Sequence, residues 1–194
     1  MKRALYGYGG HAREVAALIN EPLVFFVDDK WSNEHTLPIS EFDKEEFELM
    51  IAVANSKDRF DIASRLPKGT KYFTYIHPSA IILKNVEIGE GSFIGANSIV
   101  TCDIKIGRHA ILNRGVHIGH DCIVGDYFSA MPGSIISGNV NIGDRVYIGT
   151  NSSIKEKITV CDDVTIGLNS GVVKNIAESG YYGGIPSKKI NIQK

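Results

Sequence analysis

The chain has 194 residues, of which 43% are hydrophobic, and its formal net charge is −1. A chain of this length can bury one large hydrophobic core or two small ones. Because the charges nearly balance and no basic cluster is longer than the pair Lys188 and Lys189, nucleic acid and other polyanions are poor candidates for a partner.

The N-terminal sequence becomes glycine-rich before an apolar signal-peptide core develops, and no run of roughly 18 apolar residues occurs. We therefore expect a cytoplasmic protein with no membrane partner. The cysteines are odd in number and lack the paired spacing of metal sites, so we expect them to be reduced and structural. They are Cys102, Cys122 and Cys161.

The first third of the chain alternates short apolar runs with helical patterns, which is typical of an α/β sheet. The predicted strands cover residues 3–7, 23–29, 49–55 and 71–76. A glycine turn opens a predicted helix over 7–20, and Ser56 is the expected N-cap of a second helix that ends at residue 66. Parallel strands joined by helices predict a small half-Rossmann domain over residues 1–77.

A ligand site is expected where the strands of such a sheet end. The glycine-rich turn from strand to helix exposes backbone N–H groups that suit a diphosphate, although it does not match the full dinucleotide fingerprint. The two carboxylates that end the next strand suit sugar hydroxyls or an amine. The expected substrate-binding residues here are Gly9, Gly10, His11, Asp28, Asp29 and Asn55. The simpler interpretation is that these segments are only a tight turn and a solvated acidic turn, without a ligand.

A repeat of six residues governs the rest of the chain. Every sixth residue from Ile88 to Val172 is aliphatic, and glycine frequently follows it. Three such units close one triangular coil of a parallel β-helix, so that residues eighteen apart lie one above the other. We expect the glycines to form the corners, where they permit positive φ or close approach of the backbone. This predicts a second domain over residues 78–194.

Several motifs together resemble one family across essentially the whole chain. They are the turn "GYGGHA", the strand end "VDD", the segment "HPSA" over 77–80, the unbroken hexapeptide repeat and the terminal "GGIPSKKI". The combination is similar to the nucleotide-sugar N-acetyltransferases of the bacillosamine and perosamine pathways, a PglD-like family. The resemblance implies a left-handed β-helix, a homotrimer with active sites between neighbouring prisms, and a role in bacterial surface glycan biosynthesis.

The implied reaction moves acetyl from acetyl-CoA to the amino group of a nucleotide-linked amino-deoxy sugar, with a UDP-4-amino-dideoxy sugar favoured and no metal required. The resemblance makes His120 the general base and Asp121 the carboxylate that orients it, although Asp121 has the alternative of a simple turn residue. Gly138 lies eighteen residues after His120, so we expect it at the equivalent corner of the next coil, where its N–H stabilises the oxyanion.

The remaining site residues also follow from the resemblance. Asn113 matches an asparagine near the sugar. CoA is expected beside the corner glycines and the C-terminal segment, where Lys188 is either a phosphate ligand or a solvated side chain. These positions are Gly149, Gly167, Gly184, Ile185, Pro186 and Lys188. One departure is Ser129, which stands where some relatives carry a second histidine.

Two other functions are compatible with the sequence. A zinc-dependent hydratase of the carbonic anhydrase kind would use His109, His117 and His120, but His117 precedes an inward residue and should point outward on a flat face, away from His120. The hydratase function also assigns no role to the α/β domain. A noncatalytic sugar-nucleotide binding protein is the second alternative. An amino acid or a hydroxyl group is the alternative acceptor within acetyl transfer.

Overall fold

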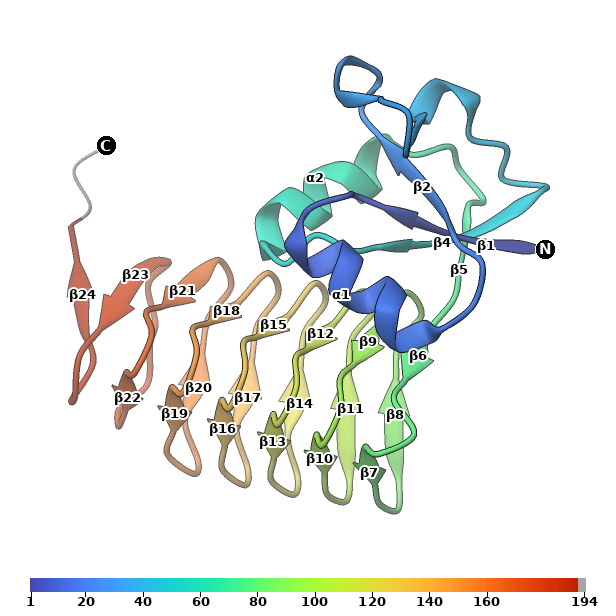
Figure 1. Cartoon of the computed structure of the whole chain (residues 1–194). Coiled ribbons are helices and arrows are strands. Elements are labelled where there is room, and N and C mark those ends of the chain that lie inside the picture. Colours follow the sequence, from blue (N-terminus) through green and yellow to red (C-terminus); the bar gives the residue numbers. More distant parts are fainter. Residues whose placement is uncertain (192–194) are drawn as a thin grey trace.

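The computed structural model describes residues 1–191 as an α/β domain followed by a long triangular prism (Figure 1). The last three residues of the predicted second domain, 192–194, lie outside the described part. The α/β sheet is parallel, with strand order β3-β2-β1-β4-β5. Its strands are β1 (Lys2–Tyr6), β2 (Val24–Val27), β3 (Leu37–Pro38), β4 (Phe47–Ile51) and β5 (Lys71–Tyr72). The helices are α1 (Gly10–Ile19) and α2 (Ser56–Arg65), with short 3-10 turns η1 (Asp29–Trp31) and η2 (Ile39–Glu41). None of the described helices is long and apolar enough to cross a membrane.

The two helices follow from local sequence. Helix α1 buries Ala12, Val15 and Ile19, which recur at helical spacing along one face. Helix α2 is capped by Asn55, whose side-chain oxygen accepts a hydrogen bond from the backbone N–H of Asp58 at 3.0 Å. The prediction that Ser56 caps this helix is therefore wrong. Its hydroxyl instead donates to the carbonyl oxygen of Val146 in the prism at 3.1 Å.

The fourth predicted strand is divided between the two parts of the molecule. Only Lys71 and Tyr72 join the α/β sheet, whereas Tyr75 and Ile76 form β6, the first strand of the prism. The reason is visible in the repeat, because stepping back by six from Ile88 gives the aliphatic residues Ile82 and Ile76. The short strand β3 was not predicted.

The prism has three sheets, parallel except for one antiparallel strand pair at the C-terminal end, and we call them the first, second and third faces in the order in which the chain visits them. The first face contains β6 (Tyr75–Ile76), β9 (Phe93–Ile94), β12 (Ile111–Leu112), β15 (Ser129–Ala130), β18 (Tyr147–Ile148) and β21 (Val164–Ile166), and continues into β23 (Gly180–Gly183) and β24 (Lys188–Ile190). The second contains β7 (Ile81–Ile82), β10 (Ile99–Val100), β13 (His117–Ile118), β16 (Ile135–Ile136), β19 (Ser153–Ile154) and β22 (Gly171–Val172). The third contains β8 (Val86–Ile88), β11 (Ile104–Ile106), β14 (Ile123–Val124), β17 (Asn141–Ile142) and β20 (Thr159–Val160). Strand partners are eighteen residues apart, as with His117 and Ile135, which confirms the predicted coil.

The glycines that follow the inward aliphatic residues serve close approach and not positive φ. A Cβ atom at Gly89 would lie 2.4 Å from the backbone nitrogen of Arg108, one coil further on, so no side chain fits there. Positive φ occurs instead three residues after each inward aliphatic residue, mostly at asparagine and aspartate, for example at Asn97, Asp103 and Asp121. These residues can adopt the left-handed conformation that turns the chain at each corner.

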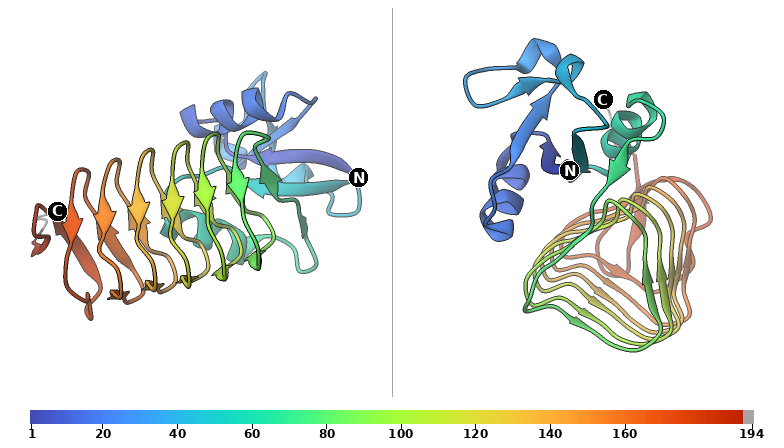
Figure 2. Two further views of the ribbon diagram at one scale, coloured as in Figure 1. Left: turned by 90° about the horizontal axis from the view of Figure 1, so that it is seen from below. Right: turned by 90° about the vertical axis from the view of Figure 1, so that its right-hand side faces the viewer.

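The α/β domain covers only the first face of the prism. Buried residues of α1, including Ala12 and Val15, pack in one cluster with Phe93 and Ile111 of that face. Figure 2 shows the triangular cross-section of the prism with the α/β domain on one side of it. We name the three corners after one residue each. The Asn113 corner joins the first and second faces, the His120 corner the second and third, and the Asp126 corner the third and first.

Candidate active site

The His120 corner carries an exposed imidazole held by a carboxylate. His120 lies between β13 and β14, and its Nδ1 is 2.7 Å from Oδ2 of Asp121. A carboxylate only accepts hydrogen bonds, so Nδ1 is the donor and Nε2 is left as the basic nitrogen. The side chain is 58% exposed, which keeps Nε2 accessible to a ligand. Asp121 has a φ of 58°, so it is both the corner residue and the partner of the histidine.

Gly138 lies directly against the ring of His120. A Cβ atom at Gly138 would be 2.6 Å from Nε2, and the backbone N–H of Asn139 donates to the His120 carbonyl oxygen at 2.8 Å. The prediction that these residues occupy equivalent corners of adjacent coils is confirmed. The Gly138 N–H has no acceptor within residues 1–191. A basic nitrogen and a residue whose backbone N–H has no acceptor within the described chain therefore lie side by side at this corner.

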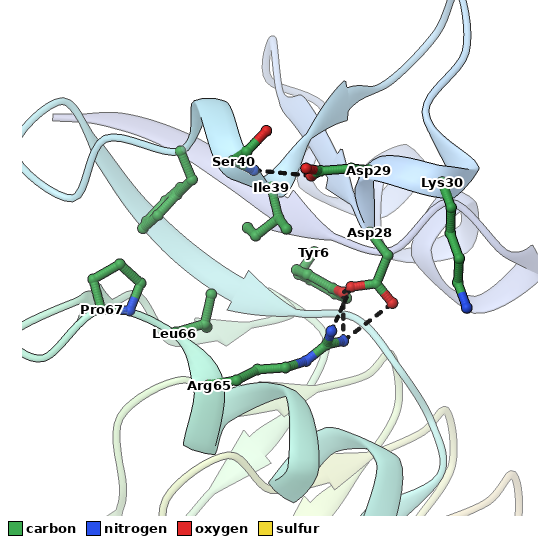
Figure 3. A pocket seen from close by; sticks show the side chains of 10 residues that line it. Tyr6, Asp28, Asp29, Lys30, Ile39, Ser40, Arg65, Leu66 and Pro67 are labelled. Atoms are coloured by element: carbon green, nitrogen blue, oxygen red, sulfur yellow. Dashed lines mark hydrogen bonds and ion pairs between the residues drawn. The ribbon is translucent and has the colours of Figure 1, made fainter.

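The α/β domain contains a cavity of about 670 Å³ at the ends of β1 and β2 (Figure 3). Asp28 lies in its wall and accepts hydrogen bonds from the hydroxyl of Tyr6 at 2.6 Å and from Nη1 and Nη2 of Arg65 at 2.6 and 3.2 Å. The hydrogen bond from Arg65 lowers the pKa of Asp28, and burial raises the pKa of Tyr6. Oδ1 of Asp29 accepts from the backbone N–H of Ser40 at 3.0 Å.

The structure brings together only part of the predicted substrate set. Asp28 and Asp29 line the cavity with Tyr6 and Arg65, which were not predicted. Tyr6 ends the central strand β1, a position that should have pointed to it. No sequence signal identifies Arg65, because its partner Asp28 is distant in the chain.

The glycine turn lies apart from the lining of this cavity. Added Cβ atoms at Gly9 and Gly10 would meet nothing within 4 Å, so the N-terminus of α1 faces open space. His11 instead packs edge-on against Phe93 of the prism, with ring centroids 5.7 Å apart, and burial lowers its pKa. Asn55 is occupied as the cap of α2.

The residues predicted for the sugar and for CoA lie along the Asn113 corner. Asn113 begins this line, and its side-chain oxygen accepts from the Arg114 N–H at 2.8 Å. Gly149 and Gly167 follow β18 and β21 at the same corner in later coils. The C-terminal hairpin continues the line, since the backbone N–H of Gly171 donates to the Gly184 carbonyl oxygen at 3.0 Å. Beyond it Ile185 is 78% exposed, Pro186 follows, and Lys188 is exposed on β24.

Other predicted residues have different surroundings. The hydroxyl of Ser129 is buried and donates to the carbonyl oxygen of Ala54 at 2.8 Å. His109 is buried at the Asp126 corner, His117 lies on the second face, and His120 is at its own corner, so the three histidines are not brought together. Residues 1–191 contain no group of three or more histidine, cysteine or acidic side chains that could hold a metal ion. All three cysteines are free.

Comparison with known families finds matches in both parts of the chain. The PglD N-terminal domain matches residues 2–66, the bacterial transferase hexapeptide (six repeats) matches 73–102, and the hexapeptide repeat of succinyl-transferase matches 139–173. The UDP-N-acetylbacillosamine N-acetyltransferase of Bacillus subtilis (strain 168) is 35% identical over 109 residues, which are 48% of this chain and 50% of that protein. The match therefore spans about half the length of this curated relative.

Similar solved structures span nearly the whole chain. WeeI from Acinetobacter baumannii AYE has a TM-score of 0.88 at 29% identity, covering 98% of this chain and 100% of that one. The acetyltransferase domain of PglB from Neisseria gonorrhoeae FA1090, in complex with acetyl coenzyme A, has a TM-score of 0.85 at 29% identity, covering 97% and 98%. The predicted fold class, an α/β domain followed by a left-handed parallel β-helix, is confirmed.

Proposed function

We propose that the chain, in which a PglD N-terminal domain match is followed by hexapeptide-repeat matches, is an acetyl-CoA-dependent N-acetyltransferase acting on the amino group of a nucleotide-linked amino sugar. A UDP-4-amino-dideoxy sugar is the favoured acceptor, and bacterial surface glycan biosynthesis the favoured context. The names of the relatives support this assignment. The observation that carries it is the imidazole of His120, held at Nδ1 by Asp121 and lying against Gly138.

These groups supply what acetyl transfer from a thioester requires. The amine nitrogen attacks the thioester carbon, and Nε2 of His120 accepts the proton that the amine loses. The N–H of Gly138 stabilises the negative charge on the thioester oxygen. The C–N bond forms, the C–S bond breaks, and the thiolate of CoA leaves with the proton that the imidazolium returns. Asp121 holds the proton on Nδ1, so that in the neutral ring Nε2 carries the free lone pair, and its carboxylate stabilises the imidazolium that forms when Nε2 accepts the proton.

A complete site requires two copies of the chain. The α/β domain covers the first face, and the residues predicted for the sugar and CoA follow the Asn113 corner, whereas His120 lies on a corner that the first face does not reach. A second copy that presents its His120 corner to the Asn113 corner of the first would join both halves. We therefore propose a homotrimer in which the second faces surround a common axis.

The distribution of apolar side chains supports this arrangement. On the second face Ile81 and Ile135 point outward and are 50% and 47% exposed. On the third face the equivalent positions are Glu87 and Lys105, which pair at 3.5 Å, then Ile123, which is 57% exposed, and the polar residues Asn141 and Thr159. The apolar face favours contact between copies, and the polar face favours solvent. In the proposed division, the α/β domain before β6 holds the nucleotide and the prism from β6 onward carries acetyl transfer, in the cytoplasm, so the boundary lies a few residues before the predicted one between 77 and 78.

The test is an acetyl-CoA consumption assay against UDP-, dTDP- and GDP-linked amino sugars with the amine at C3 or C4. We expect one class of nucleotide sugar to gain an acetyl group, detected by mass spectrometry, and the His120→Ala variant to lose this activity. If the chain binds a nucleotide sugar but acetylates none, it is the noncatalytic binding protein. Zinc-dependent bicarbonate formation without acetyl transfer would establish the hydratase instead.

A further inference from the structure

Arg59 of α2 is a fully buried cation, with 0% of its surface exposed, at the junction of the α/β domain and the prism. No carboxylate of residues 1–191 is among its hydrogen-bond partners. Burial lowers its pKa to about 9, so the guanidinium is still charged at neutral pH. Burying a charge is costly unless every polar atom of the group finds a partner. The partners of Arg59 therefore show what this residue is placed to do.

All three nitrogen atoms of the guanidinium donate hydrogen bonds, and they join the two parts of the molecule. Within the α/β domain, Nη1 donates to the carbonyl oxygens of Val53 at 2.6 Å and Ala54 at 3.2 Å. Within the prism, Nε donates to His109 O at 2.9 Å, and Nη2 donates to Tyr127 O at 2.9 Å. A lysine has a single donor atom and could not reach these separated carbonyl groups.

Two carbonyl groups of the prism have Arg59 as their hydrogen-bond donor. The carbonyl oxygens of His109 and Tyr127 accept from no other group within residues 1–191, and the α/β domain removes them from water. Nη2 also donates at 2.8 Å to the hydroxyl of Ser129, which in turn donates to the carbonyl oxygen of Ala54 at 2.8 Å. Arg59 and Ser129 thus form one closed network across the junction.

The same helix connects this network to the cavity. Arg65, six residues after Arg59 on α2, binds Asp28 in the cavity wall. Six residues of α-helix span about 9 Å, so α2 acts as a short rigid connection between the prism and the cavity. In the proposed trimer the amine must meet His120 of another copy. A shift of roughly 1 Å in the position of the substrate can lower the rate about 100-fold.

We propose that Arg59 is a positioning residue that fixes the cavity relative to the prism, so that the acceptor amine reaches the base at the proposed active site. This inference rests on the proposed function for its catalytic consequence. Its structural content, a fixed placement of α2 on the prism, can be measured without any substrate.

The kinetic test compares Arg59→Met with Arg108→Met, a matched loss of an exposed arginine that pairs with Asp126 at 2.9 Å. For Arg59→Met we expect kcat to fall about 100-fold, while the Kd for the free nucleoside diphosphate of the acceptor stays within about twofold of the parent value. The Arg108→Met variant should keep both. A parent kcat in Arg59→Met, or a nucleotide affinity that falls in parallel with kcat, would overturn the proposal.

A second variant covers the case in which Arg59→Met does not fold. Ser129→Ala removes the two bonds that its hydroxyl makes in the network but leaves the guanidinium with its carbonyl partners, and we expect kcat to fall about fivefold with unchanged KM for acetyl-CoA. Hydrogen exchange measures the placement itself. In both variants the amides of α2 should lose protection while those of β1 and β4 keep it, and unchanged protection of α2 would contradict the inference. This outcome holds even if the parent protein acetylates no nucleotide sugar, which would disprove only the proposed function.

Discussion

The Asp126 corner and the His120 corner have the same backbone geometry but differ in whether their backbone N–H groups are hydrogen-bonded. At the Asp126 corner the N–H groups of Arg108, Asp126 and Asp144 donate to carboxylates one coil further on, at 2.9, 2.8 and 3.0 Å. At the His120 corner the N–H groups of His120 and Gly138 have no acceptor within the described chain. A corner of the prism can thus serve as a binding site where its backbone N–H groups have no acceptor within the described chain.

The two corners also contain histidines in contrasting surroundings. His109, at the Asp126 corner, is 2% exposed and stacks on Tyr127 with ring centroids 5.0 Å apart. Burial lowers its pKa to about 4. His120 is exposed and is held at one nitrogen only. A histidine on this repeat is therefore a buried packing residue at one corner and an exposed side chain, bound to a carboxylate, at another.

The largest effect is expected from His120→Ala, compared with Asp126→Ala at the equivalent position of the other corner. Removing a general base should lower kcat about 100-fold or more with little change in KM. Asp126→Ala should keep kcat within about twofold, because its carboxylate serves only the backbone and Arg108. Steady-state kinetics decides the matter, and near-normal turnover in His120→Ala would place the base elsewhere.

Gly138→Ala should have the next largest effect, compared with Gly119→Ala. The three atoms nearest to a new Cβ at residue 138 all belong to the His120 ring, at 2.6 to 3.0 Å, so we expect the ring to move while the coil survives. We expect kcat to fall roughly 30-fold with an unchanged melting temperature. At Gly119 the added atom would meet backbone atoms of Ser137 and Gly138 at 2.8 and 2.7 Å, which should destabilise the fold by about 1 to 3 kcal/mol. A thermal melt that ranks the two variants in the reverse order would refute this distinction.

Acid should destabilise the protein through His109. Its pKa is about 4 in the folded protein against an ordinary value of 6.5, so between these values the unfolded chain binds a proton that the folded chain does not. The free energy of unfolding therefore falls as pH drops through this range, by about 2 kcal/mol between pH 7 and pH 5. Urea unfolding of His109→Phe should show a shallower pH dependence than the parent. Parallel curves would mean that His109 does not contribute.

The smallest effect is expected from Asp121→Asn. Asparagine occupies the equivalent corner at Asn139 with a φ of 59°, so the variant should fold normally. The neutral amide can either accept from or donate to Nδ1, so it no longer fixes the proton there or stabilises the imidazolium, and we expect kcat to fall about tenfold. The matched change Asp103→Asn, at the same corner one coil earlier, should leave kcat unchanged. Equal kinetics in both variants would assign Asp121 to the turn alone.

The sequence predicts the prism well because each coil repeats the same local rule. The spacing of inward aliphatic residues determines which residues share a corner, and therefore places His120 against Gly138. The second recurring signal, asparagine or aspartate at the left-handed position, was present in the sequence but not used. It would have shown that Asp121 is a corner residue as well as a neighbour of the base.

The α/β domain was predicted less completely, because its important contacts join distant segments. Asp28 could be found at a strand end, but its partner Arg65 comes from a different element. Arg59 gives no sequence signal at all, since a buried cation that binds carbonyl groups depends on the docked structure and not on a motif. Sequence periodicity does not predict the contacts between two parts of a chain that pack against each other.

The period of eighteen residues determines which residues meet at the candidate site. Loss or gain of one hexapeptide between His120 and Gly138 would carry every later residue to the next corner, so that the glycine would no longer face the imidazole. Loss or gain of three hexapeptides outside the segment from His120 to Gly138 would return each residue to its own corner and change only the length of the prism. Such chains can therefore grow or shrink in whole coils. The gain or loss of a single hexapeptide is the smallest change that would keep the fold and disrupt the candidate site.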